Sequence, residues 1–443
     1  MEPNQQDVQE QILTPKQCKH GNLMYIIEAA VEYFISLLIT GSYLAKVSTA
    51  IGISDAVTGV LTSFVSLGCT FQIFALFLSR KRRVKRFIIV WEMIAQSLYM
   101  FVYIVPLVKI STTMKHVIFV GVLLFGHLME HLTKSPKTAW FMSLVDPHKR
   151  GKFTAIKEIV SLIGGITVTT LAGNMMTYFE KRNDLKTAFI ICGISIFVFM
   201  VIHAFTLIST VSVEQKTETH ADGSKVTIGE TAKEMFTNRT LVLIIASYTL
   251  YKIVTSSTVS FFGTFQNNDL KFSMSFIAIL TAIGSIVRAV ASIPLGKFAD
   301  KYSFRNLLIL CYSLFGLSLV PIIFATPENG KVTFIIFRIV HDLGMGGITS
   351  GSINIIYDNF NKSKAVNAMA IKNAISGSIG FLSSVLAGVI VARIQANGGI
   401  FGMNIYAHNF LSFIGVILTG VNILILAVFL KKKPRDKTRG SIR

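Results

Sequence analysis

The sequence predicts an all-α membrane protein of twelve transmembrane helices, arranged as two six-helix bundles. Composition is the first observation: 52% of the 443 residues are hydrophobic and 15% are charged, whereas soluble domains carry about 25% charged residues. The second is a series of twelve apolar segments of about 20 residues, the length that a helix needs to cross the hydrocarbon core. The third is an internal repeat that relates the two halves of the chain.

Six apolar segments precede a long polar stretch. They cover residues 22–45, 54–78, 87–108, 116–143, 154–178 and 187–210. Each is long enough to span a membrane as a helix. Residues 1–21 are polar and lack the short apolar core and cleavage site of a signal peptide, so we expect a cytoplasmic N-terminal tail. Residues 22–210 are therefore predicted to form the N-terminal six-helix bundle.

The polar stretch 211–239 falls at the midpoint of the chain and is predicted to be a cytoplasmic linker. Six further apolar segments then form the predicted C-terminal six-helix bundle, residues 240–430. They cover residues 240–264, 273–295, 305–326, 332–357, 366–392 and 404–430. Residues 431–443 form a basic cytoplasmic tail.

The distribution of charge explains the net charge of +20. Most of the Lys and Arg side chains lie in the tails and in the loops on one side of the predicted membrane, which is the bias of cytoplasmic loops. Both termini are therefore expected in the cytoplasm. The basic cluster at residues 80–86 is expected to lie against the membrane surface, and nucleic-acid binding is not indicated. The short loops look bacterial, so we expect a multi-pass protein of the bacterial inner (cell) membrane.

The two halves share a sequence repeat. Residues 152–173, KFTAIKEIVSLIGGITVTTLAG, align without a gap with residues 367–388, NAMAIKNAISGSIGFLSSVLAG. Ala-Ile-Lys and Leu-Ala-Gly recur at the same separation in both copies. Because each half has six segments, the copies have the same topology, which predicts parallel repeats related by an axis along the membrane normal.

The connection after the eighth segment, residues 296–306, reads GKFADKYSFRN. It resembles the G-x-x-x-D-(K/R)-x-x-x-(R/K) loop of the major facilitator superfamily, and the topology resembles that family over nearly the whole chain. The resemblance implies the fold of this family, and a cytoplasmic gate that contains Gly296, Asp300 and Arg305. The first-half counterpart, residues 79–86, keeps the basic residues but lacks the glycine and the aspartate.

Two further stretches bear on this resemblance. Residues 146–151, DPHKRG, are similar to the D-x-x-x-R-G loop of the family. Residues 161–166, SLIGGI, lack the Gly-Pro element that drug/proton antiporters of the family usually carry in the fifth span. This difference argues against classical multidrug export.

Ionisable residues inside apolar segments are candidate functional residues, because a charge at the centre of a membrane helix costs about 2.5–3.5 kcal/mol on insertion scales. In the resembled fold, spans 1, 4, 7 and 10 line the central cavity, and most of these residues fall on those spans. The predicted substrate and proton cavity comprises Glu28, Glu32, His127, Glu130, Lys252, Arg288, Arg338, His341 and Asp342.

The acidic members of this set are expected to carry protons. Glu28 and Glu32 lie one helical turn apart, and each disfavours ionisation of the other, which suits proton coupling. A structural ion pair with Lys252 or Arg338 is the alternative interpretation. Glu130 and Asp342 are further candidate proton carriers.

The histidines and bases have separate expected roles. His127 or His341 would relay protons, whereas Arg338, Lys252 and Arg288 would hold an anionic or hydrogen-bonding part of the solute. His203, near the end of the sixth segment, is expected at the membrane interface.

The fourth segment contains H-x-x-E-H at residues 127–131, the pattern of inverted zinc proteases. Two His four residues apart share one face of a helix and can bind Zn²⁺. The pattern lies inside an apolar span of a chain without a soluble catalytic domain, so a zinc hydrolase is not predicted. The four cysteines show no paired spacing, and no resident metal is expected.

No G-x-x-x-x-G-K-(S/T) phosphate-binding loop occurs in the sequence, so ATP is not expected to drive the protein. We predict a non-enzymatic secondary transporter that moves a small polar solute by alternating access, coupled to protons. It is expected to act as a monomer without a cofactor. The alternatives are a proton-driven drug or toxin exporter, a divalent-metal transporter and a non-transporting sensor.

Overall fold

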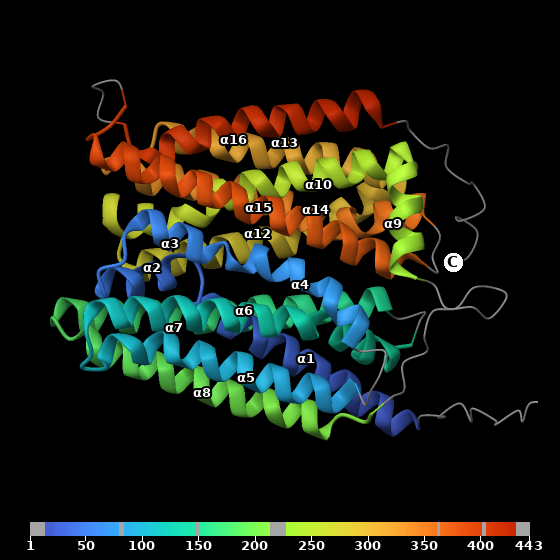
Figure 1. Ribbon diagram of the computed structural model, residues 1–443, viewed down its shortest axis with the longest axis horizontal. Helices are drawn as coiled ribbons and strands as arrows, with labels where there is room; N and C mark the ends of the chain where they lie inside the picture. Colours follow the sequence, from blue (N-terminus) through green and yellow to red (C-terminus); the bar gives the residue numbers. More distant parts are fainter. Residues whose placement is uncertain are drawn as a thin grey trace, which may run out of the picture.

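The computed structural model describes residues 14–78, 84–146, 150–212, 227–360, 364–400 and 405–430. Within these residues, twelve helices are long and apolar enough to cross a membrane. They lie side by side in Figure 1, and α1 begins at the end of the molecule where the C-terminal helix finishes. We call this the terminal end and the opposite end the far end. The predicted fold class is confirmed.

The N-terminal bundle forms from the first eight helices. They are α1 (Pro15–Leu38), α2 (Gly41–Ala50), α3 (Asp55–Thr62), α4 (Phe64–Leu78), α5 (Val84–Ile104), α6 (Thr112–Ser143), α7 (Arg150–Lys181) and α8 (Leu185–Ser209), with the 3₁₀ turn η2 (Val105–Leu107) after α5. Together, α3 and α4 make the second span, and α2 is a short helix at the far end.

The C-terminal bundle follows the short helix α9 (Ile228–Thr237). Its elements are α10 (Arg239–Ser257), η4 (Val259–Phe261), α11 (Phe262–Thr264), the π-helix η5 (Phe265–Asp269), α12 (Met274–Lys301), α13 (Phe304–Ile323), α14 (Gly330–Asn359), α15 (Ala365–Ala396), α16 (Ala407–Leu424) and η7 (Ile425–Phe429). The seventh span therefore changes from α-helix to 3₁₀- and π-helix as it reaches the far end.

Several helices extend beyond the predicted segments. Helix α1 begins at Pro15, inside the stretch predicted as a tail, because Thr14 and Gln17 form a capping box at its start. Helix α9 lies within the predicted linker, and its Glu234 pairs with Lys364 at 2.7 Å. The basic cluster before Val84, the centre of the DPHKRG loop, residues 213–226 of the linker and the basic tail lie outside the described residues.

The first predicted segment is broken near its end. Helix α1 stops at Leu38, and α2 starts at Gly41, whose φ of 54° is a left-handed conformation that glycine adopts without strain. This break turns Ser42 toward the other half of the molecule. The Ser42 hydroxyl donates to Gln266 Oε1 at 2.6 Å, and Asn267 Nδ2 donates to the Ser42 carbonyl oxygen at 2.7 Å.

The two halves pack against each other along two helix pairs, α4 with α15 and α7 with α12. Hydroxyl groups meet on the first pair, where Thr70 Oγ1 and Ser378 Oγ lie 2.9 Å apart. On the second pair, Ser275 Oγ lies 2.9 Å from Thr177 Oγ1. Polar contacts between closely packed helices are typical of membrane interiors, where hydrocarbon offers no competing partner.

The two copies of the sequence repeat form helices α7 and α15. The lysine of the repeated Ala-Ile-Lys makes the same kind of contact in both copies. Lys157 Nζ lies 4.5 Å from the ring centroid of Tyr25 on α1. Lys372 Nζ lies 3.8 Å from the ring centroid of Tyr248 on α10. Each half thus places one lysine over a tyrosine ring of its first span, a favourable cation–π arrangement.

Candidate functional site

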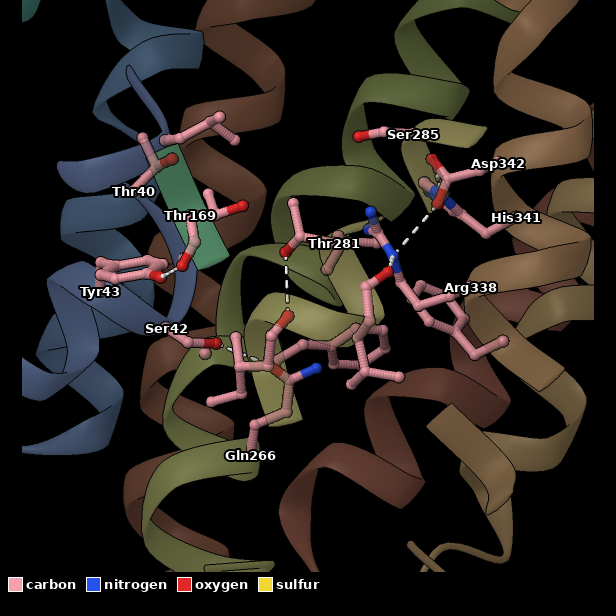
Figure 2. A pocket seen from close by; sticks show the side chains of 18 of the residues that line it. Thr40, Ser42, Tyr43, Thr169, Gln266, Thr281, Ser285, Arg338, His341 and Asp342 are labelled. Atoms are coloured by element: carbon pink, nitrogen blue, oxygen red, sulfur yellow. Dashed lines mark hydrogen bonds and ion pairs between the residues drawn. The ribbon is translucent and has the colours of Figure 1, made fainter. Parts of the chain in front are cut away.

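A cavity of about 330 Å³ lies between the two halves of the molecule. Helices α1, α2 and α7 of the N-terminal bundle supply one wall, and η4 to α12 together with α14 supply the other. Figure 2 shows Thr40, Ser42 and Tyr43 on one side, facing Arg338 and its neighbours on the other. A cavity of this size is large enough for a small organic solute.

The acidic and basic side chains that line this cavity come from the C-terminal bundle. They are Arg288 on α12, with Arg338, His341 and Asp342 on α14. Arg338 Nε lies 3.1 Å from Asp342 Oδ2, but its proton is directed at the carbonyl oxygen of Leu280, 3.2 Å away. The ion pair therefore leaves Asp342 Oδ2 without a hydrogen bond.

Helix α12 makes room for this ion pair through Gly284. A β-carbon at Gly284 would overlap both the Asp342 carboxylate and the Arg338 guanidinium. The absence of a side chain at this position therefore allows α12 and α14 to enclose a salt bridge between them. The burial of Asp342, which is 6% exposed, depends on this close approach.

Arg288 joins the cavity to the N-terminal bundle. Its NH2 group lies 3.0 Å from Glu158 Oε1 on α7, an ion pair across the two halves. Its Nε is buried and has no hydrogen-bond partner. Arg288 Nε and Asp342 Oδ2 are thus both buried without a hydrogen-bond partner, although both residues contribute to the lining of the cavity.

A second charged cluster lies inside the N-terminal bundle, outside the lining of this cavity. Lys137 Nζ on α6 contacts three carboxylates, at 2.8 Å from Glu28, 2.9 Å from Glu32 and 2.7 Å from Glu92. The first two carboxylates belong to α1 and the third to α5. His203 on α8 adds its Nε2, 3.4 Å from Glu28 Oε1. We call these five residues the Lys137 cluster.

The Lys137 cluster is almost fully enclosed. Glu28 and Glu92 are 1% exposed and His203 is 0% exposed, whereas the Glu32 side chain is 22% exposed. His203, expected at the membrane interface, is instead buried among Glu28 and Gln96. The partner of Glu28 and Glu32 is Lys137 rather than Lys252 or Arg338.

The remaining predicted cavity residues lie elsewhere. His127 and Glu130 are both bonded to Tyr99 of α5, and they do not line the cavity. Lys252 also lies outside the lining, with its Nζ 6.0 Å from the Tyr248 ring centroid.

The three predicted gate residues lie on two helices. Gly296 and Asp300 belong to the last turns of α12, and a β-carbon at Gly296 would meet no atom within 4 Å. Arg305, in the first turn of α13, donates to the carbonyl oxygens of Leu426 at 3.0 Å and Ala427 at 2.7 Å. In this structure Arg305 therefore contacts the C-terminal end of the last span through its backbone carbonyl groups.

Three ionisable residues of these contacts are absent from the predicted cavity set: Glu92, Lys137 and Glu158. Each had a usable signal in the sequence, because each is a charge within an apolar segment. They fall on spans 3, 4 and 5.

Comparison with known proteins agrees with this architecture. The family model of the Major Facilitator Superfamily matches residues 23–273 and 253–442. The chain belongs to this superfamily, and it is a multi-pass membrane transporter rather than an enzyme. No protein of curated function matches the chain in sequence.

Solved structures of several transporters share the fold. A D-xylose-proton symporter superposes with a TM-score of 0.66 at 13% identity, over 94% of this chain and 98% of that chain. The nucleoside transporter NupG gives 0.65 at 15% identity, over 94% and 100%. An auto-inhibited POT family peptide transporter gives 0.70 at 12% identity, over 95% and 98%. At these identities the likeness concerns the fold alone.

Proposed function

We propose that the protein is a proton-coupled secondary transporter of a small polar solute that carries an acidic group. The cavity between the halves is the observation that carries this proposal, because Arg288 and Arg338 line it together with a single carboxylate, Asp342. Two guanidinium groups favour carboxylate or phosphate groups, which they bind through paired hydrogen bonds.

Alternating access requires that each end of the cavity open in turn. At the far end the halves are joined by Ser42 with Gln266, and by Asn268 with Asp55 at 2.5 Å. These contacts support a far end that is closed in this structure. The bias of Lys and Arg in the loops supports a terminal end in the cytoplasm. With the far end closed, the solute would enter or leave the cavity from the cytoplasmic side.

The Lys137 cluster is the proposed proton site. Three carboxylates around one ammonium group carry a net charge of −2 when all are ionised. Such an excess is unfavourable in a buried site inside a membrane. The cluster is therefore expected to hold a proton in at least one state of the cycle. Glu32 is the proposed carrier, because its side chain is the most exposed of the three.

The solute class is tested first by thermal stabilisation of the purified protein. Sugars, amino acids, organic anions, drugs and divalent metals would be screened at pH 5.5 and 7.5, since a ligand of the folded state raises the melting temperature. We expect hits among carboxylates or phosphates, lost in Arg338→Gln and kept in Lys331→Gln on the same helix. A hit that survives Arg338→Gln would contradict this cavity as its site.

Proton coupling is tested in proteoliposomes with the solute found in that screen. Glu32→Gln is expected to abolish accumulation driven by a pH gradient while keeping solute counterflow, which needs no net proton movement. Normal accumulation in Glu32→Gln would contradict the proton assignment and leave the solute assignment standing. Loss of counterflow as well would place Glu32 in the solute pathway instead.

A further inference from the structure

The side chains of His127, Glu130 and His131 converge on one face of α6. Their nearest ligand atoms all lie within 4.8 Å of one another. His127 and His131 are each 2% exposed, and Glu130 is partly buried. The Lys137 cluster and the cavity use none of these three side chains.

The hydrogen bonds around the two histidines fix which ring nitrogen is free. Tyr99 donates its hydroxyl proton to Glu130 Oε2 at 2.5 Å, so its oxygen accepts from His127 Nδ1 at 2.8 Å. His131 Nδ1 donates to the carbonyl oxygen of His127 at 2.9 Å. Both neutral rings are thereby held with Nδ1 protonated and the lone pair on Nε2. Metal-binding histidines are typically held in this way by a second partner.

One of these lone pairs is left without any partner. His127 Nε2 is buried and makes no hydrogen bond, an unfavourable state for a polar atom in a membrane interior. Helix α4 closes over the group, since a β-carbon at Gly68 would lie 2.6 Å from His131 Nδ1.

We propose that His127, His131 and Glu130 on α6 bind a transition-metal ion such as Zn²⁺. Two imidazoles and a carboxylate form a ligand set of the kind that Zn²⁺ takes. With bonds of about 2.0–2.2 Å, the ion would draw the ligand atoms closer together. Three protein ligands leave the fourth position of a tetrahedral ion for a water molecule.

The ammonium group of Lys134 would compete with the metal ion for the Glu130 carboxylate. Lys134 Nζ lies 3.6 Å from Glu130 Oε1. Its side chain is 46% exposed, so it can turn toward water when Glu130 takes up the ion. This proposal is independent of the solute and of proton coupling.

The test is direct metal binding to the purified protein after dialysis against a chelator. We expect one equivalent of Co²⁺ to bind with the visible spectrum of a tetrahedral site, and Zn²⁺ to displace it. His127→Ala and His131→Ala should each abolish the spectrum. His116→Ala, on the same helix and bonded to the Ile51 carbonyl oxygen, should retain it.

A second variant tests the hydrogen bond that orients His127. Tyr99→Phe should weaken Zn²⁺ binding by about 10–100-fold, the usual effect of losing a second partner. Melting curves of each variant without metal show whether it is folded. Absence of Co²⁺ binding by the folded native protein, or binding that survives both histidine substitutions, would overturn the proposal.

Discussion

Lys137 contacts three acidic side chains within the N-terminal bundle and holds them together. It lies on α6, and its contacts reach two helices, α1 and α5. Thr133, one turn earlier on α6, donates to the same Glu92 oxygen at 2.6 Å. A lysine at this position therefore serves packing as well as the proposed proton site.

Replacing Lys137 with Met is expected to destabilise the protein strongly. Removing one partner of a buried ion pair leaves uncompensated charge and costs about 3–5 kcal/mol. Thermal unfolding in detergent at pH 7.5 measures the effect, and lowering the pH should restore part of the lost stability because the carboxylates can then take up protons. The matched control is Lys134→Met, whose side chain is 46% exposed and whose loss should change stability little. Equal melting temperatures for the two variants would contradict a central role for Lys137.

The position of the Arg338–Asp342 ion pair on α14 depends on the neighbouring helix α12. The two residues lie one turn apart on α14, yet their geometry depends on Gly284 of α12. The same face of α12 carries Arg288, which reaches Glu158 of the other half. Helix α12 thus links the shape of the cavity to the packing of the two bundles.

Gly284→Ala is expected to weaken solute binding at least tenfold. The added methyl group would displace the ion pair, and overpacking of this kind costs about 1–3 kcal/mol. The shift in melting temperature with added solute reports binding, and counterflow reports transport.

Gly420→Ala on α16 is the control for that substitution, because a β-carbon there meets no atom within 4 Å. It should leave both measurements unchanged. Unaltered solute affinity in Gly284→Ala would show that the position of the Arg338–Asp342 pair does not matter for binding.

At the scale of the whole molecule, the far-end contacts decide whether the two bundles can move apart. Asp55, at the start of α3, accepts from Asn268 at 2.5 Å and from Gln395 at 3.0 Å, and both donors belong to the C-terminal bundle. Alternating access requires these contacts to break in each cycle.

Cross-linking across the far end is therefore expected to stop transport. Cysteines in place of Asp55 and Asn268, joined by a short reducible linker, should abolish counterflow, and reduction should restore it. Cysteines in place of Lys46 and Glu180 are the matched control, because this ion pair lies within the N-terminal bundle. Full counterflow in the quantitatively cross-linked Asp55–Asn268 variant would contradict opening at this end.

The sequence by itself determined the properties that follow from order along the chain. The length and apolar character of each segment predict a span without reference to any neighbour, and the comparison of the two halves reveals the repeat. Membership of the superfamily, transport and the absence of enzymatic activity were predicted in this way and are confirmed. Arg338 and Asp342 were also predicted as cavity residues from the sequence, because charges inside spans stand out, although Asp342 was predicted there as a proton carrier.

The tertiary structure alone decided which of those charges meet. Lys137 contacts acids from α1 and α5, Glu158 pairs with Arg288 across the halves, and Tyr99 bonds His127 and Glu130. The sequence carries little information on these pairings, because a membrane helix is apolar on its lipid-facing side as well as in its core. Its hydrophobic pattern therefore does not reveal how it is rotated about its axis or which helix it faces. Only the packed structure fixes that rotation, and with it the cavity, the proposed proton site and the proposed metal site.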